Sequence, residues 1–136
     1  MNATYAVVDS GTTSTRLRLW RDGAVVWAGK RAAAARDTAI LGSNVRIRDA
    51  LRELLSSALA ETGRRPDAVI CSGMITSNLG LHEVPHVRAP AGPDDLARGI
   101  VEVAFADVST APFAFVPGVK THPEGLELDD LAGGDV

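Results

Sequence analysis

Three short apolar runs, separated by turn residues, open the sequence and constrain its fold more than any other feature. They cover residues 5–8, 17–20 and 24–27 and are rich in residues that favour β-strands. Asp22 and Gly23 stand between the last two runs, and this dipeptide is a strong hairpin signal because glycine accepts the positive φ of a tight turn. The pattern therefore predicts three consecutive antiparallel strands.

A helical pattern comes after these strands. From Ser43 to Thr62 apolar residues recur at spacings of three and four, which predicts an amphipathic helix with Ser43 as its cap and Gly63 as its end. Residues 67–71 form the next apolar run and predict a fourth strand. A loop rich in glycine and proline then extends to about Gly92.

The last part of the chain predicts a second helix and a fifth strand. Pro93 is favoured at a first helical position, and Leu96, Ile100 and Val103 would form the buried stripe of this helix. Residues 112–116 predict the fifth strand. The order βββαβαβ indicates one α/β domain with a mixed sheet, which resembles the ribonuclease-H-like fold.

Composition excludes several classes of protein. The 136 residues carry a formal net charge of -3 and scattered arginines, which argues against nucleic-acid binding. No window is long and apolar enough for a membrane span, and the first residues lack a secretion signal. Cys71 is the only cysteine, so a buried, inert thiol is expected in place of a disulfide. We expect a cytoplasmic protein that binds neither nucleic acid nor membrane.

The segment from Asp9 to Arg16 carries the residues most suited to phosphate chemistry. Asp9 ends the first strand and would hold Mg²⁺ through water, because this ion keeps much of its hydration shell. Gly11 lets an anion approach the backbone. Hydroxyl groups that could bind phosphate come next, at Thr12, Thr13 and Thr15. Arg16 would offset the charge of a transferring phosphoryl group. A plain hairpin loop, in which Asp9 caps local amides, is the alternative.

Two motifs resemble a known kinase family. The pattern Asp-x-Gly-Thr-Thr-x-x-Arg at residues 9–16 is similar to the first phosphate motif of the superfamily that contains sugar kinases, actin and the heat-shock chaperones. The stretch Gly-Met-Ile-Thr-Ser-Asn-Leu-Gly at residues 73–80 resembles the 2-dehydro-3-deoxygalactonokinase family. Residues 84–85, 90–91 and 116–119 resemble this family as well, so the likeness spans essentially the whole chain.

The resemblance implies the N-terminal lobe of an actin-like ATPase or sugar kinase fold. It implies transfer of a phosphoryl group from ATP, with Mg²⁺, to the 6-hydroxyl of 2-dehydro-3-deoxygalactonate, a keto sugar acid. In the family the polypeptide continues into a second lobe, whereas this sequence stops at Val136. We therefore expect residues 1–136 to form one lobe that needs a second lobe as its partner and is inactive alone. A homo-oligomer is compatible with this expectation.

The resemblance also implies that the loop after the fourth strand meets the sugar acid. The substrate-binding candidates are Gly73, Met74, Ser77 and Asn78. Ser77 and Asn78 carry groups suited to hydroxyls or a carboxylate. Loop stabilisation is the alternative role for both, because serine and asparagine are common in turns.

Phosphoryl transfer also needs a carboxylate near the acceptor hydroxyl. Asp135 is the candidate for this catalytic base. Its alternative is an ordinary acidic tail residue, with the base lying beyond the end of this chain.

Three other functions compete with the kinase. His82-Glu83-Val84-Pro85-His86 matches the zinc-protease spacing H-E-x-x-H, but Pro85 opposes the helix that this motif requires. A metal-dependent nuclease could use Asp9, although such sites need several converging carboxylates. A non-catalytic sugar- or nucleotide-binding module, such as a degenerate kinase lobe, stays open.

Overall fold

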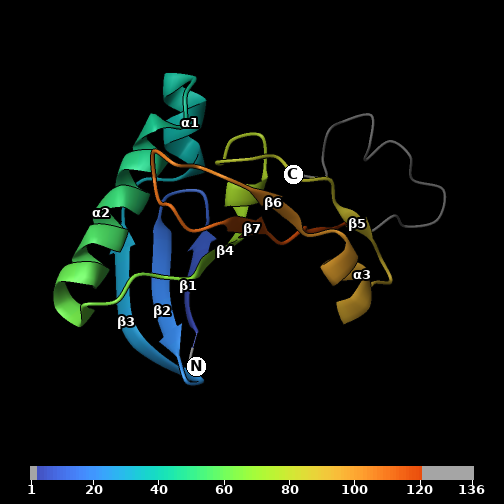
Figure 1. The fold of residues 1–136 in the computed structure, drawn as a ribbon. Coiled ribbons are helices and arrows are strands. Elements are labelled where there is room, and N and C mark those ends of the chain that lie inside the picture. The colour runs from blue at the N-terminus through green and yellow to red at the C-terminus, as the bar shows by residue number, and fades with distance from the viewer. Residues whose placement is uncertain (1–2, 121–136) are drawn as a thin grey trace.

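A six-stranded mixed sheet forms the centre of the computed structural model, which describes residues 3–120 (Figure 1). The strands lie side by side across the sheet in the order β3-β2-β1-β4-β7-β6. Their bounds are Thr4–Ser10 for β1, Thr15–Arg21 for β2, Ala24–Arg31 for β3, Ala68–Gly73 for β4, Val101–Val103 for β6 and Phe113–Phe115 for β7. A separate pair joins β5 (Val87–Arg88) to β8 (Val119–Lys120).

The first three strands form the predicted antiparallel meander. β1 pairs with β2, and β2 pairs with β3, in antiparallel register. Asp22 and Gly23 form the tight turn between β2 and β3, with φ of 55° and 74°. Positive φ at both positions is the signature of the primed hairpin turn that this dipeptide favours, so the prediction is confirmed.

The remaining strands extend the sheet on the other side of β1. β4 lies parallel to β1, β7 lies parallel to β4, and β6 closes the edge antiparallel to β7. Three antiparallel strands come first, helices follow β3, and β4 then joins the sheet parallel to β1. This is the ribonuclease-H-like arrangement that the element order predicted. β1 is consequently a central strand, with an antiparallel neighbour on one side and a parallel neighbour on the other.

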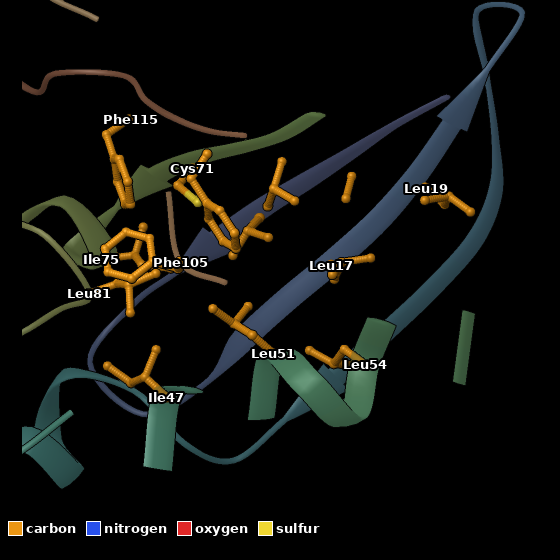
Figure 2. Packing of buried hydrophobic residues seen from close by; sticks show 14 of the residues in the cluster. Leu17, Leu19, Ile47, Leu51, Leu54, Cys71, Ile75, Leu81, Phe105 and Phe115 are labelled. Atoms are coloured by element: carbon orange, nitrogen blue, oxygen red, sulfur yellow. The ribbon is translucent and has the colours of Figure 1, made fainter. Parts of the chain in front are cut away.

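Two helices follow the meander, and the longer one covers one of its faces while the shorter one packs against the longer (Figure 1). They are α1 (Ala35–Leu41), which the sequence did not predict, and α2 (Val45–Thr62). Leu17 and Leu19 of β2 face Leu51 and Leu54 of α2, and all four side chains are fully buried (Figure 2). The predicted end of α2 is correct, because Gly63 adopts the left-handed conformation and donates its amide to the carbonyl of Leu59. The helix begins two residues after Ser43, with Asn44 at the cap position.

An aromatic cluster fills the other half of the core. The rings of Phe105, Phe113 and Phe115 contact one another with centroids 5.3 to 6.3 Å apart. Ile75 lies beside Phe105 (Figure 2). Cys71 is buried in the same core, and this burial raises the pKa of its thiol to about 12, as expected of an inert cysteine.

The predicted second helix is shorter than its apolar pattern indicated. α3 (Pro93–Arg98) begins at the proline as expected, but Gly99 ends it. A side chain at position 99 would come within 3.0 Å of Pro117 and Val87. The stripe of Leu96, Ile100 and Val103 does not form, because Ile100 is 40% exposed and residues 101–103 belong to β6. That prediction is wrong: two β-branched valines flanking Glu102 suit a strand. None of the helices described in residues 3–120 could span a membrane.

The face of the sheet opposite α2 is here called the outer face. Along β1 and β2, alternate side chains are buried toward α2, and the intervening ones are exposed or half-buried on the outer face. Tyr5, Trp20 and Val25 make one end of this face apolar, with exposed fractions of 42%, 37% and 44%. The other end of the outer face, nearer the carboxyl terminus of β1, is charged and includes the exposed Asp9.

Candidate functional site

The turn between β1 and β2 is held by its backbone and leaves its hydroxyls exposed. The amide of Gly11 donates to the carbonyl of Ser14 (3.0 Å), and the amide of Arg36 in α1 donates to the carbonyl of Thr12 (2.9 Å). Thr12 and Thr13 are exposed, and their hydroxyls bond to no side chain or backbone group within residues 3–120. A Cβ built on Gly11 would meet no heavy atom within 4 Å. The turn is therefore firmly anchored and open on its outer side.

Thr15 lies apart from these hydroxyls. Its side chain is fully buried, and its hydroxyl donates a 2.6 Å hydrogen bond to the carbonyl of Ala33. This bond fixes the segment that leads into α1. The structure therefore places the predicted phosphate-binding residues in two groups, with Gly11, Thr12 and Thr13 on the open turn and Thr15 beneath it.

Asp9 and Arg16 lie opposite one another on the outer face. They are register partners in the antiparallel pair of β1 and β2, and both side chains are exposed. Directly opposed residues have Cβ atoms about 5 Å apart. One end of the sheet thus presents a carboxylate and a guanidinium as neighbours, beside the open turn.

Gly73 links the two sequence motifs. It ends β4, pairs with Ser10 of β1 and has a φ of 84°. A Cβ on this residue would lie 2.5 Å from the carbonyl oxygen of Ser10 and 2.8 Å from Oδ1 of Asp9. Only glycine fits, since both the conformation and the space exclude a side chain. Because Gly73 has no Cβ, the Asp9 carboxylate has room to lie over the end of β4.

The loop after Gly73 is tied to itself. The hydroxyl of Ser77 donates to the carbonyl of Met74 (2.7 Å) and accepts from the amide of Leu79 (3.2 Å). The hydroxyl of Thr76 donates to the carbonyl of Gly73 (2.9 Å). These bonds stabilise a 3-10 turn, Met74–Thr76, and the residues directly after it. Loop stabilisation, the alternative role for Ser77, is the role that its geometry displays.

The other substrate-binding candidates differ in accessibility. Asn78 is exposed at the tip of the loop, and its amide bonds to no group within residues 3–120. Met74 is half-buried in the 3-10 turn. The candidate base, Asp135, lies outside the described residues.

Residues 3–120 hold no group of three or more histidine, cysteine, aspartate and glutamate side chains that could bind a metal by themselves. The H-E-x-x-H segment is not helical. His82 packs against Phe115, with ring centroids 5.4 Å apart, whereas His86 lies next to Gly118. A protease-type zinc site is therefore not assembled in the described part of the chain. A single carboxylate such as Asp9 fits an ion that keeps its water and binds substrate phosphates.

A family model for 2-keto-3-deoxy-galactonokinase matches residues 9–135. The chain belongs to this family. Nearly every residue is included in the match, and both motifs lie within it. The comparison with curated proteins found no match.

Among solved structures, the chain is similar to a protein from Sinorhizobium meliloti described as a 2-dehydro-3-deoxygalactonokinase. The two share 24% identity with a TM-score of 0.64, over 88% of this chain and 36% of that one. Two structures of an Aquifex aeolicus protein of the Ppx/GppA family align with 18% and 17% identity and TM-scores of 0.41 and 0.39. The chain thus spans about a third of the length of the solved relatives that it matches, and the first of them has the same fold.

Two features of the site could not be read from the sequence. One is the approach of Gly73 to Asp9, which depends on the parallel pairing of β1 and β4. The other is the position of Lys30, which is the register partner of Arg16 on β3. The tight turn at Asp22 and Gly23 would by itself pair Arg16 with Gly29. A register shift between Leu19 and Trp20 brings Lys30 opposite Arg16 instead, and the sequence carries no clear signal for that shift.

Proposed function

We propose that this chain is one lobe of a two-lobed kinase that transfers the γ-phosphoryl group of ATP to the 6-hydroxyl of 2-dehydro-3-deoxygalactonate. Membership of the 2-keto-3-deoxy-galactonokinase family supports the reaction class. The observation that carries the proposal is the position of the Asp9 carboxylate, beside the open turn and over the glycine that ends β4.

The turn would bind the phosphates of the nucleotide. The open space over Gly11 lets an anion approach the turn, although the Gly11 amide itself donates to Ser14. The hydroxyls of Thr12 and Thr13 form no hydrogen bond within residues 3–120 and would donate to the phosphates. Asp9 would hold Mg²⁺ through water, and that ion neutralises phosphate charge when it is bound. Arg16, opposite Asp9, would offset the negative charge that develops during transfer.

The sugar acid would lie against the loop after β4. Asn78 is exposed and its side-chain amide forms no hydrogen bond within residues 3–120, so it would bind the sugar acid, whereas Ser77 shapes the loop. A second lobe would close over both substrates and exclude water, which favours transfer to the sugar over hydrolysis. The catalytic base, for which Asp135 is the candidate, and a cytoplasmic location belong to the same proposal.

The test uses the complete product of the gene that carries this sequence. ADP formation is measured with ATP, Mg²⁺ and 2-dehydro-3-deoxygalactonate. Asp9→Asn should lower kcat about 100-fold or more, because the metal loses its anionic ligand. Asp22→Asn is the matched control, since that aspartate lies in the exposed hairpin turn and asparagine also accepts positive φ. Circular dichroism checks that both variants fold.

Turnover by Asp9→Asn at the wild-type rate would remove Asp9 from the metal site. A wild-type protein that binds Mg²⁺ and ATP but phosphorylates no keto sugar acid would instead favour the alternative, a non-catalytic nucleotide-binding module. Binding is measured by isothermal titration calorimetry, so the two outcomes are separable.

A further inference from the structure

Three cations gather on the outer face of the sheet, next to the candidate site. Arg16 and Arg18 lie two residues apart on β2, and Lys30 lies on β3 directly opposite Arg16. All three side chains are exposed. Together with Ala28 and Gly29 they line a hollow of about 320 Å³. We call this feature the cationic hollow.

The described residues place one carboxylate, that of Asp9 opposite Arg16, beside the three cations, so the charge of the cationic hollow is only partly balanced. None of its five lining residues is acidic, and none of its cations forms a salt bridge within residues 3–120. Elsewhere in residues 3–120 five arginines pair with carboxylates and five do not, and the paired ones are Arg21, Arg31, Arg48, Arg52 and Arg98. Like charges directly opposite one another on paired strands are destabilising. An anion bound in the hollow would offset the repulsion between Arg16 and Lys30, which explains why the two cations lie opposite one another.

The shape of the hollow suits an oxyanion. Ala28 is the register partner of Arg18, and its small side chain leaves room beside the guanidinium. Arg18 can offer two parallel N–H groups to a phosphate or carboxylate, while the Lys30 ammonium adds a compact charge from the neighbouring strand. The two side chains approach the space from different strands.

The hollow also lies within reach of the reacting atoms. Asp9, Arg16 and Lys30 are consecutive register partners on β1, β2 and β3. Neighbouring strands are about 4.8 Å apart, so the backbone of Lys30 lies about 10 Å from that of Asp9. A small molecule with one group near Asp9 can therefore place an anionic group in the hollow.

We propose that Arg18 and Lys30 form, with Arg16, an oxyanion-binding subsite of the same active site. The subsite holds an anionic group of a substrate, which is either a phosphate of the nucleotide or the carboxylate of the sugar acid. This assignment rests on the proposed function, and it adds two specificity-determining residues to it. Both sources offer planar or tetrahedral oxygens that arginine and lysine recognise.

The proposal is tested by nuclear magnetic resonance titration of the 136-residue chain with two separate probes, inorganic pyrophosphate and galactonate. Saturable shifts are expected at the amides of Ala28, Gly29 and Lys30. The double variant Arg18→Gln, Lys30→Gln should weaken binding about tenfold or more, since two charge-assisted contacts are lost. Arg64→Gln, which removes an exposed cation just beyond α2, is the matched control and should bind as the wild type does.

Each outcome of the titration decides the proposal. Saturation by pyrophosphate alone assigns the hollow to nucleotide phosphate, and saturation by galactonate alone assigns it to the sugar acid. Absence of saturable shifts with both probes, or equal affinity in the double variant, overturns the subsite. Neither result would overturn the kinase proposal, because the titrations measure binding and not phosphoryl transfer. A complete gene product that phosphorylates the sugar acid with unchanged KM values for both substrates in the double variant would keep the kinase and remove the subsite.

Discussion

The turn after β1 and the loop after β4 are built from similar residues but use them in opposite ways. Both come after neighbouring parallel strands and both are rich in glycine, serine and threonine. In the turn, the backbone bonds to itself and to α1, so Thr12 and Thr13 stay exposed. In the loop, Thr76 and Ser77 supply the bonds that the backbone needs. In these two segments, hydroxyl groups stay available for ligands where backbone groups form their hydrogen bonds with other backbone groups.

Gly73→Ala should have the largest effect on this comparison, because the glycine joins the two segments. The new Cβ would clash with the Ser10 carbonyl and the Asp9 carboxylate, and alanine would be strained at a φ of 84°. We expect a loss of roughly 3 kcal/mol in the free energy of unfolding, measured by urea denaturation. Gly11→Ala is the control, since nothing lies within 4 Å of its Cβ. Equal losses in the two variants would show that Gly73 has no special place.

Removing one hydroxyl from each segment tests the contrast directly. Ser77→Ala should lower the free energy of unfolding by about 1 kcal/mol, because the Met74 carbonyl and the Leu79 amide each lose a partner. Thr12→Ala should change stability by less than about 0.5 kcal/mol, yet weaken the binding of Mg²⁺-ATP in calorimetry. Stability losses of the same size would contradict the division of roles between turn and loop.

A modest effect, no larger than that of Ser77→Ala, is expected at the tether between the loop and α2. The side-chain amide of Asn44 donates to the carbonyls of Gly80 and Leu81, at 3.4 Å each. Because these bonds are long, Asn44→Ala should cost about 1 kcal/mol or less. Hydrogen exchange should quicken at Leu81 and not at Gly11. Unchanged exchange at Leu81 would mean that the tether does not hold the loop.

Local signals in the sequence predicted the elements that depend on local physics. The Asp22-Gly23 turn, the period of α2 and its glycine end were all readable, because each involves residues close together in the chain. The failure at residues 93–103 has the same origin. A spacing of three and four was present, but Gly99 packs against Pro117 and Val87, which no local pattern reveals.

The candidate site was predictable in its parts and not in its assembly. Asp9, Gly11 and Arg16 were identified from one motif, and the structure brings them to one end of the sheet. The burial of Thr15 and the internal bonds of Ser77 were not predictable, because the residue type alone does not say which group a hydroxyl will meet. Lys30 was overlooked because a register shift between Leu19 and Trp20 brings it opposite Arg16, and the two-residue turn does not predict that shift.

The central place of β1 links the site to the order in which the chain can fold. Asp9 has one register partner, Arg16, seven residues away and another, Ser72, 63 residues away. The first contact needs only a hairpin, which closes on a microsecond timescale. The second requires a large loop to close, which is the slower kind of event. The carboxylate therefore gains its neighbour Gly73 only when the long-range pairing forms, and the conformational entropy of placing the site is lost during folding instead of during substrate binding.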